Sequence, residues 1–526
     1  MLLKKNITII LLVLIIILAS ILRLQYLNKP LQRDEVVFYE SVKNLNIKNI
    51  PIFCENCLDE HGTLITIFNY HTQLFITYFR YIVYFFDLNE TVLRFSIVIF
   101  SLATVVLIYF LGNEMGGKKL GLLSAFFLAI NRLHVEHSQI IDIDGSFFTF
   151  FLILNIFFIL KWFKTNKRKY FIFSVISSII LILVKEPAVL IFFPLFLYFY
   201  KKKKINKFLE FLTVTLSLSI IFILLFNYFY SSNFFDGFLQ QINKIVTKKP
   251  IENTLTRVYQ FIGITTWDFT LPFVLISLFS IFYVWKEKKE YFKFLLYVVL
   301  SFVLFYTVIL GLTRYFVPII PVVCLLVSNY IINLKIKDSR KSIILILSTI
   351  VLCYLIFYFL KIRTDLYFLS EIKTNFSLII IPYLLCTIPL TLYFLKYRNF
   401  SLILLIGMSI GYNIFFAQEA VNPLITPDYS KAITDATEFI KNSNIKAPIV
   451  TSEDISFHSN KEYYNIKRMN KKSIEKIIDE YKIKYVIYKT NDLVIQQDVK
   501  EFLEKKCVNV KSFYSKNVEI LKVFKC

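Results

Sequence analysis

Many long apolar runs, separated by short clusters of basic residues, constrain the fold of this chain more than any other feature. A helix needs about 20 apolar residues to cross the hydrocarbon core of a bilayer. Runs close to this length include residues 7–22, 208–228, 292–310, 315–334 and 343–360. The hydrophobic share of the chain is 56%, above the roughly 45–50% of soluble domains. The sequence therefore predicts an all-α polytopic membrane protein.

Basic residues are concentrated in every second connection between these runs. Because cytoplasmic connections retain Lys and Arg, the alternation predicts the topology. With Lys4 inside, the inner segments 161–169 and 201–207 carry five basic residues each, whereas the short outer turns 131–146 and 185–187 carry one each. We expect about 13 spanning helices in the plasma membrane, with the N-terminus cytoplasmic. The net charge of +23 reflects this topology, so no nucleic-acid partner is expected.

The first apolar run also has the basic start of a secretory signal peptide. No small-x-small cleavage site follows it, which favours an uncleaved first span. A long polar segment, residues 23–90, follows as the first outer loop. Within it, the semi-apolar residues 64–86 have the pattern of a helix lying partly along the membrane surface.

The composition changes towards the C-terminus and predicts two domains. Residues 1–427 form the expected transmembrane domain, and residues 428–526 are mostly polar. Short β-like runs in the polar part lie at 448–451, 485–488 and 518–524, and helical patterns lie at 430–441 and 472–481. We therefore expect a small extracytoplasmic α/β domain at the C-terminus.

The seven cysteines divide according to this topology. Cys324, Cys353 and Cys386 lie in apolar spans, where cysteine behaves as a small hydrophobic residue. Four others lie outside in two local pairs, Cys54 with Cys57 and Cys507 with Cys526. An oxidising exterior permits disulfides there, with free thiols as the alternative. A metal site at Cys54-x-x-Cys57 is less favoured, because no second CxxC completes four ligands.

Charged residues gather at the predicted outer ends of the spans. Asp34 and Glu35 follow the first span, Lys185 stands between two spans without a polar linker, and Arg314 precedes the span at 315–334. A charge at bilayer depth costs about 2.5–3.5 kcal/mol on insertion scales, so such groups tend to line wet cavities. Each charge alone is better explained as an interfacial residue at a helix end. Together, on one side, they suit a reaction between a polar group and a phosphate.

These motifs resemble the GT-C superfamily of glycosyltransferases that use polyprenyl-phosphate sugars, in the branch of protein O-mannosyltransferases and lipid A aminoarabinose transferases. The pair Asp34-Glu35 is similar to the catalytic motif of the first outer loop in that branch. The segment from His137 to Asp144 (HSQIIDID) is similar to the second outer loop, with Asp144 at the position of its aspartate. The resemblance covers about residues 7–330.

Four further segments carry the resemblance. The segment His71-Thr-Gln-Leu is similar to a His-Pro-Pro-Leu motif but lacks both prolines, and Arg94 stands where the family often has Arg at the start of span two. Lys185-Glu-Pro is similar to Lys-Gly-Pro, and Arg314-Tyr315-Phe-Val-Pro is similar to Arg-Tyr-x-x-Pro. The order of these motifs and their common outer placement carry the likeness.

The resemblance implies an inverting hexosyl- or pentosyltransferase that moves a sugar from a lipid-linked donor to a hydroxyl of a protein, lipid or glycan. It implies catalytic roles for Asp34 as general base, Glu35 and Asp144; lipid-phosphate binding by Lys185, Arg314 and Arg94; and acceptor or sugar contacts from His71, His137 and Tyr315. No metal or other cofactor is expected, although a divalent cation between the carboxylates is the alternative.

A transporter or flippase of lipid-linked sugars is the second hypothesis. Transporters place ionisable residues near the bilayer midplane and often break their helices there. In this chain the middles of the apolar runs are nearly free of charge, and the ionisable residues lie at their ends. This distribution favours an enzyme.

Overall fold

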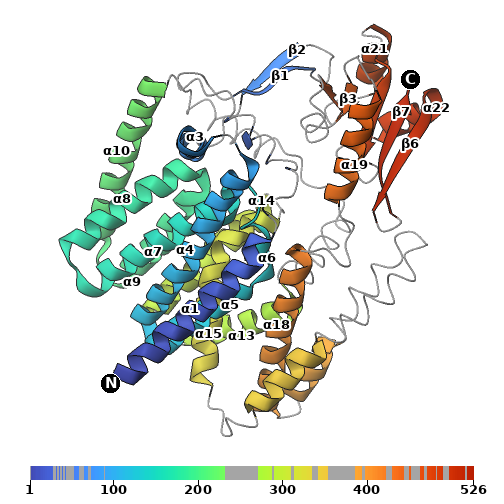
Figure 1. The fold of residues 1–526 in the computed structure, drawn as a ribbon. Helices are drawn as coiled ribbons and strands as arrows, with labels where there is room; N and C mark the ends of the chain where they lie inside the picture. The colour runs from blue at the N-terminus through green and yellow to red at the C-terminus, as the bar shows by residue number, and fades with distance from the viewer. Residues whose placement is uncertain are drawn as a thin grey trace. The chain divides into compact units, whose positions relative to one another are not determined.

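The described part of the chain forms two compact units, shown in Figure 1. The computed structural model describes residues 2–25, 27, 31, 35, 38–39, 42, 52–58, 64–68, 73–87, 89–230, 270–286, 289–309, 313–334, 342–353, 385–393, 397–421, 429–443, 449–451, 463–466, 471–480, 483–489, 497–515 and 518–526. The first unit consists of the described residues in Met1–Leu27, His71–Ile362 and Ile372–Asn422. The second unit includes those in Asn28–Tyr70 and Pro423–Cys526.

The first unit is helical. Its helices include α1 (Leu2–Leu24), α3 (Gln73–Phe86), α4 (Glu90–Gly116), α5 (Lys118–Ile130), α6 (Arg132–Glu136), α7 (Phe148–Thr165), α8 (Arg168–Val184), α9 (Phe192–Lys201), α10 (Ile205–Tyr230), α13 (Leu271–Lys286), α14 (Glu290–Ile309), α15 (Ile320–Asn333) and α18 (Arg398–Val421). Three irregular turns directly precede α7, α9 and α15. They are the π-helix η1 (Ile143–Phe147) and the 3-10 helices η2 (Glu186–Ile191) and η4 (Thr313–Ile319).

Five helical stretches in the described residues are long and apolar enough to cross a membrane: Ile7–Leu24, Glu90–Gly116, Ile143–Thr165, Ile205–Leu225 and Arg314–Asn333. Shorter apolar helices, such as Leu271–Lys286 and Asn399–Phe415, lie beside them in the sequence. Large apolar side chains on the outside of the unit remain exposed, for example Ile10 on α1 (56%) and Leu224 on α10 (54%). Such surfaces need lipid to cover them. The expected membrane class is confirmed, whereas the number of about 13 spans stays a prediction.

Glycine allows α4 and α5 to approach each other closely. A Cβ added at Gly121 on α5 would lie 2.4 Å from the carbonyl oxygen of Tyr109 on α4, and one at Gly112 would lie 2.8 Å from the Cα of Gly121. Helices in lipid associate largely through such small residues, because the hydrophobic effect does not drive them together there. The two glycines thus fix the hairpin that leads into the segment 131–147.

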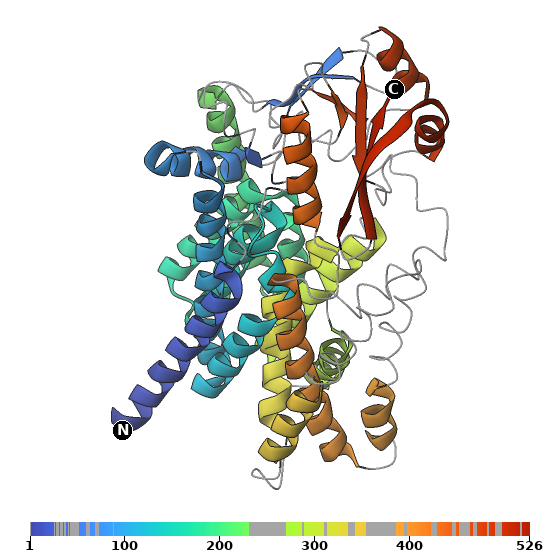
Figure 2. The ribbon, with the colours of Figure 1, turned by 45° about the vertical axis from the view of Figure 1, so that its right-hand side comes forward.

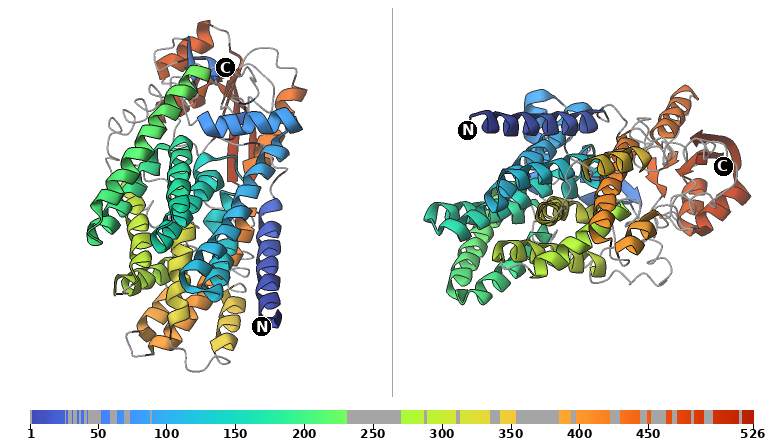
Figure 3. Two further views of the ribbon diagram at one scale, coloured as in Figure 1. Left: turned by 90° about the vertical axis from the view of Figure 1, so that its left-hand side faces the viewer. Right: turned by 90° about the horizontal axis from the view of Figure 1, so that it is seen from below.

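Helix α3 lies across the end of α4 in Figure 3, where it is the medium-blue helix near the top of the left-hand view. Phe75 and Phe79 on one face are buried, whereas Tyr84 and Phe85 on the other face are exposed. This division is typical of a helix that lies in the membrane interface. The sequence predicted a surface helix over 64–86; the structure has the strand Leu64–Phe68 and the helix Gln73–Phe86 within that range.

The second unit contains a five-stranded sheet in the order β4-β3-β5-β7-β6. The strands are β3 (Ile449–Thr451), β4 (Tyr463–Asn465), β5 (Tyr485–Lys489), β6 (Val508–Ser515) and β7 (Val518–Lys525). Strand β3 is parallel to β4 and β5, whereas β7 is antiparallel to β5 and β6. The unit also has a hairpin of β1 (Ile52–Leu58) and β2 (Leu64–Phe68).

Helices cover both faces of this sheet, as Figure 2 shows. On one face α19 (Tyr429–Asn442) contributes Ala436 and Ile440 to a core that includes Ile487 of β5. On the other face α21 (Lys471–Glu480) and α22 (Gln497–Lys506) pack against Val486 and Tyr488 of the same strand. Successive residues of β5 therefore point to opposite cores, as the period of a strand requires. The unit has an α/β architecture.

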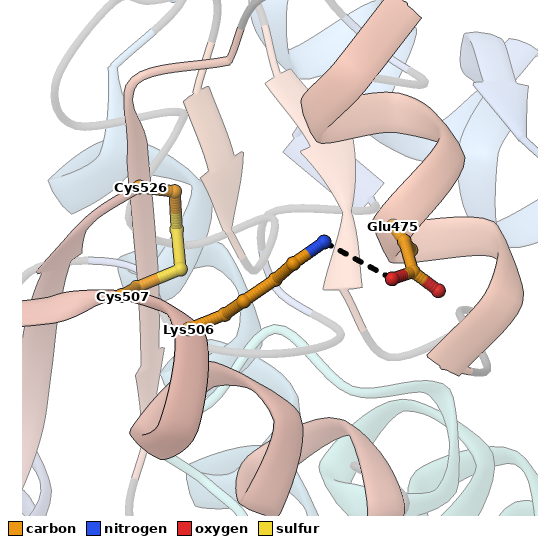
Figure 4. Close-up of a disulfide and its surroundings, with 4 residues drawn as sticks. All are labelled: Glu475, Lys506, Cys507 and Cys526. Carbon is orange, nitrogen blue, oxygen red and sulfur yellow. Dashed lines mark hydrogen bonds and ion pairs between the residues drawn. A yellow bond between two sulfur atoms is a disulfide. The ribbon is translucent and has the colours of Figure 1, made fainter.

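A disulfide joins Cys507 at the end of α22 to Cys526 after β7, with a Cα–Cα distance of 4.4 Å (Figure 4). It closes a loop over a sequence separation of 19 residues around the β6–β7 hairpin. The three cysteines predicted to lie in spans, Cys324, Cys353 and Cys386, are buried free thiols.

The substitution Cys526→Ser is expected to destabilise the second unit by about 3 kcal/mol, because the crosslink restricts a loop of this length in the unfolded chain. Limited proteolysis of the full-length protein across a temperature series measures the effect as earlier cleavage after residue 423. Lys506→Gln is the matched control. It breaks the exposed pair with Glu475 (3.1 Å), which is worth no more than about 1 kcal/mol. Equal cleavage of both variants would contradict the prediction.

Candidate functional site

Three charged residues of the first unit lie where regular helices give way to tighter or wider turns. Asp144 lies in η1, Arg314 lies in η4, and Lys185 caps the C-terminus of α8 immediately before η2. Proline accounts for two of these breaks. Pro187 lacks an N–H and its ring would clash with the preceding turn, so α8 ends at Val184. Pro318 lies inside η4, where its missing N–H cannot donate the hydrogen bond of a regular α-helix.

The side chain of Asp144 joins the two cations. Its Oδ1 accepts a hydrogen bond from Nζ of Lys185 in an ion pair, and its Oδ2 lies 3.8 Å from Nε of Arg314. The side chains of Asp144 and Lys185 are only 5% and 12% exposed, whereas that of Arg314 is 33% exposed. Lys185 follows Asp144 by 41 positions, and Arg314 lies still further along the chain. We call these three residues, Asp144, Lys185 and Arg314, the ion cluster.

An aromatic ring supports both cations of the ion cluster. Nζ of Lys185 lies 4.9 Å and Cζ of Arg314 lies 5.4 Å from the centre of the Tyr315 ring. Tyr306 of α14 stacks against Tyr315 at a centroid distance of 5.1 Å and an interplanar angle of 11°. Cation–π contacts of this kind become stronger where water is excluded. The ring therefore helps to hold the two positive charges close together.

A second carboxylate, Asp142, lies beside the ion cluster. Its Oδ1 accepts a hydrogen bond from the backbone N–H of Asp144 (3.0 Å), and its Oδ2 lies 3.2 Å from Nδ1 of His137. Burial by itself raises the pKa of Asp142, but the hydrogen bond with His137 and the charge of Arg314 outweigh it, and the pKa falls well below its ordinary value. Burial lowers the pKa of Lys185, yet the adjacent Asp144 carboxylate raises it by more. Asp142 and Lys185 therefore both stay charged near neutral pH.

Gly145 lets the segment carrying Asp144 fold back on itself. Its backbone is non-helical (φ −69°, ψ −122°) inside η1. A Cβ at this position would lie 2.5 Å from the carbonyl oxygen of His137, closer than real Cβ atoms approach. The carbonyl oxygen of Gly145 accepts a hydrogen bond from Oγ1 of Thr149 (2.5 Å) in the first turn of α7. A small residue is thus required next to the aspartate.

Gly145→Ala is expected to lower the stability of the protein by about 1–3 kcal/mol, the range observed for overpacked sites. The added methyl group must displace the backbone of η1 or of His137. Thermal unfolding of the detergent-solubilised protein measures the change as a lower Tm. Ser146→Ala is the matched control, since the Ser146 hydroxyl has no hydrogen-bond partner among the described residues. A Gly145→Ala Tm equal to that of wild type would contradict this account.

Arg23, at the end of α1, is fully buried and ties that helix to the segment before the ion cluster. Its guanidinium donates to Oγ of Ser101 (2.8 Å), to the carbonyl oxygen of Ala129 (2.8 Å) and to Nδ1 of His134 (2.9 Å). Gln139 adds a bond from its Nε2 to the carbonyl oxygen of Leu22 (2.6 Å). These contacts fix where the chain leaves α1, a role that no pattern in the sequence indicates for Arg23.

The remaining predicted site residues are placed as follows. Arg94 is buried on α4 and donates to the carbonyl oxygen of Leu27 (3.2 Å), so it supports the chain just after α1. Glu35 is buried, with 2% of its surface exposed, and belongs to the second unit. Asp34 and His71 lie outside the described residues. The structure therefore brings together Asp144, Lys185, Arg314 and Tyr315. His137 is connected to this group indirectly, through its contact with Asp142.

No group of three or more His, Cys, Asp or Glu side chains in the described ranges is arranged to hold a metal ion. Within the ion cluster both oxygens of Asp144 face cationic side chains. The roles given to the individual site residues remain predictions.

The fold and the site together define a polytopic membrane protein with a buried cluster of charges at the ends of its helices. A sequence model of the family described as dolichyl-phosphate-mannose-protein mannosyltransferase matches residues 72–226. This range contains η1 and the turn with Lys185. No curated protein sequence matches the chain.

Solved structures share the fold over nearly the whole chain. ArnT from Cupriavidus metallidurans in the apo state has a TM-score of 0.63 at 10% identity, covering 99% of this chain and 98% of ArnT. The same protein bound to undecaprenyl phosphate gives 0.60 at 11% identity, with the same coverage. The archaeal oligosaccharyltransferase AglB from Archaeoglobus fulgidus, in complex with an inhibitory peptide and a dolichol-phosphate, gives 0.53 at 13% identity, covering 92% of this chain and 70% of AglB.

The expected resemblance to the GT-C superfamily is confirmed by the family match and by these structures. Residues 72–226 match the mannosyltransferase family, and nearly the whole chain has the fold of these solved structures. This outcome favours the enzyme over the transporter hypothesis.

Proposed function

We propose that the protein transfers a sugar from a polyprenyl-phosphate donor to an acceptor hydroxyl on the extracytoplasmic side of the plasma membrane. The observation that carries the proposal is the convergence of Lys185 and Arg314 on one buried point, the carboxylate of Asp144. Two cations that converge on one anion suit a phosphate group. Structures with this fold that contain undecaprenyl phosphate or a dolichol-phosphate support the same donor class.

The leaving group explains why cations are needed. A polyprenyl phosphate leaves as a stable anion, so it requires no proton from the enzyme. Arg314 can bind two phosphate oxygens with its planar guanidinium, whereas Lys185 acts as a compact point charge. Fixed charges of this kind stabilise the developing negative charge most strongly where water is excluded. No metal is required in this scheme, because side chains supply the positive charge.

The acceptor hydroxyl must lose its proton as it attacks the anomeric carbon. Asp34 is the proposed general base, on the strength of the motif that it shares with the family. With one base and no enzyme nucleophile, a single displacement inverts the anomeric configuration. Glu35 and Asp144 orient the sugar or the acceptor, and His71 and His137 contact them. Arg94 is proposed as a further phosphate contact.

The side of the membrane follows from two observations. The disulfide between Cys507 and Cys526 requires an oxidising compartment, which supports an extracytoplasmic C-terminal unit. The basic segments 161–169 and 201–207 favour the cytoplasm and connect the opposite ends of the helices that carry the ion cluster.

Transfer by the purified protein tests the proposal. Full-length protein in lipid nanodiscs is incubated with polyprenyl-phosphate sugars and candidate acceptors, and released polyprenyl phosphate is measured together with the anomeric configuration of the product. We expect phosphate release that depends on the acceptor, with inversion. Mass spectrometry of surface glycoconjugates from cells with and without the protein identifies the acceptor. Transfer from a nucleotide sugar, with none from a lipid donor, would refute the proposal.

A further inference from the structure

The ion cluster already contains an anion in the position suited to a phosphate. Both oxygens of Asp144 face a cation, Oδ1 that of Lys185 and Oδ2 that of Arg314. A phosphate group bound by the same two side chains would present two oxygens in the same manner. The carboxylate and the donor phosphate therefore compete for one pair of cations.

We propose that Asp144 is a positioning residue that occupies the phosphate site before the donor arrives and is displaced when the donor binds. In the empty site it holds Lys185 and Arg314 ready; in the occupied site its freed carboxylate accepts a hydrogen bond from a hydroxyl of the sugar or acceptor. This inference rests on the proposed function and assigns the order of events within it.

The charge of the cluster makes displacement necessary. Lys185 and Arg314 carry two positive charges, and Asp142 and Asp144 carry two negative ones, so the group is balanced without a ligand. A phosphate added beside an unmoved Asp144 carboxylate would meet a like charge a few ångströms away in a water-poor site, which is strongly unfavourable. Movement of Asp144 leaves the two cations to the phosphate.

The two cations keep their places when Asp144 leaves. Both lie against the ring of Tyr315, which is itself stacked on Tyr306. Asp142 remains bonded to the backbone N–H of Asp144 and close to His137, so the turn keeps its anchor while the Asp144 side chain rotates.

Binding of polyprenyl monophosphate to full-length protein in nanodiscs tests the inference. Asp144→Asn should bind the probe about tenfold or more tightly than wild type, because the competing charge is gone, while its kcat for transfer falls. Asp144→Glu keeps the carboxylate and should bind like wild type. Asp142→Asn removes a nearby charge but leaves the Asp144 carboxylate between the two cations, so it should raise affinity by less than Asp144→Asn does.

Each other result has one meaning. Binding by Asp144→Asn that equals or falls below wild type, with normal thermal unfolding, overturns the displacement of Asp144 and leaves the proposed function intact. If Asp144→Asn does not fold, the binding measurement uses Asp144→Ser instead, which removes the same charge. Binding of the probe to Lys185→Met with unchanged affinity overturns the phosphate site, and no binding to wild type overturns the proposed donor.

Discussion

Replacing Lys185 with methionine is expected to lower kcat/KM for sugar transfer about 10²–10³-fold, the effect of removing one preorganised donor to developing charge. Lys185 is buried and points at the proposed phosphate position, so water cannot replace its charge. The substitution also leaves Asp144 without its closest partner in a buried site, which adds to the loss. Initial rates of polyprenyl phosphate release from nanodisc-embedded protein provide the measurement.

Lys161→Met is the matched control for this substitution. Lys161 also lies in an ion pair, with Glu114 (2.5 Å), but at the opposite end of α7 from the ion cluster. The control should retain transfer within about threefold of wild type, as expected for the loss of a partly exposed pair. Similar losses in both variants would mean that Lys185 has only a structural role.

Asp34→Asn is expected to reduce kcat about 10²–10⁴-fold, the contribution typical of a positioned general base. The amide has nearly the shape of the carboxylate but cannot accept the proton of the acceptor hydroxyl. Donor binding should change little, because Asp34 is not assigned to the phosphate. Single-turnover transfer with a saturating donor separates the two effects.

Asp479→Asn, on the exposed side of α21, is the control for this second prediction. It removes the same charge far along the chain and should leave transfer and membrane insertion unchanged. Near-normal turnover of Asp34→Asn would exclude Asp34 as the base. Glu35, its neighbour in the motif, would then be the next residue to substitute.

Periodicity and length predicted the main elements of the fold. Long apolar runs must become helices in lipid, because only helices and closed barrels satisfy their backbone groups there. In the polar C-terminal part, the β-like runs 448–451, 485–488 and 518–524 correspond to β3, β5 and β7. The patterns missed β4, β6 and α22. Strand β6 is exposed along most of its length and β4 has only three residues, so neither forms an apolar run.

The residues of the ion cluster were predicted, but their arrangement was not. Charge at helix ends and the motif likeness indicated Lys185 and Arg314 as a phosphate-binding pair, and Asp144 as a separate catalytic residue. That both cations contact one carboxylate depends on η1 and η4 coming together, which no local pattern specifies. Arg23 was missed for a related reason. At the end of an apolar run it is expected to reach water, and only the packing of α1 against α4 and α5 shows that it is buried.

A structure of the full-length protein with bound polyprenyl phosphate tests the central claim most directly. The account predicts phosphate oxygens within hydrogen-bonding distance of both Lys185 and Arg314, with Asp144 turned away from them. A phosphate bound elsewhere, with the pair between Lys185 and Asp144 unbroken, would contradict it.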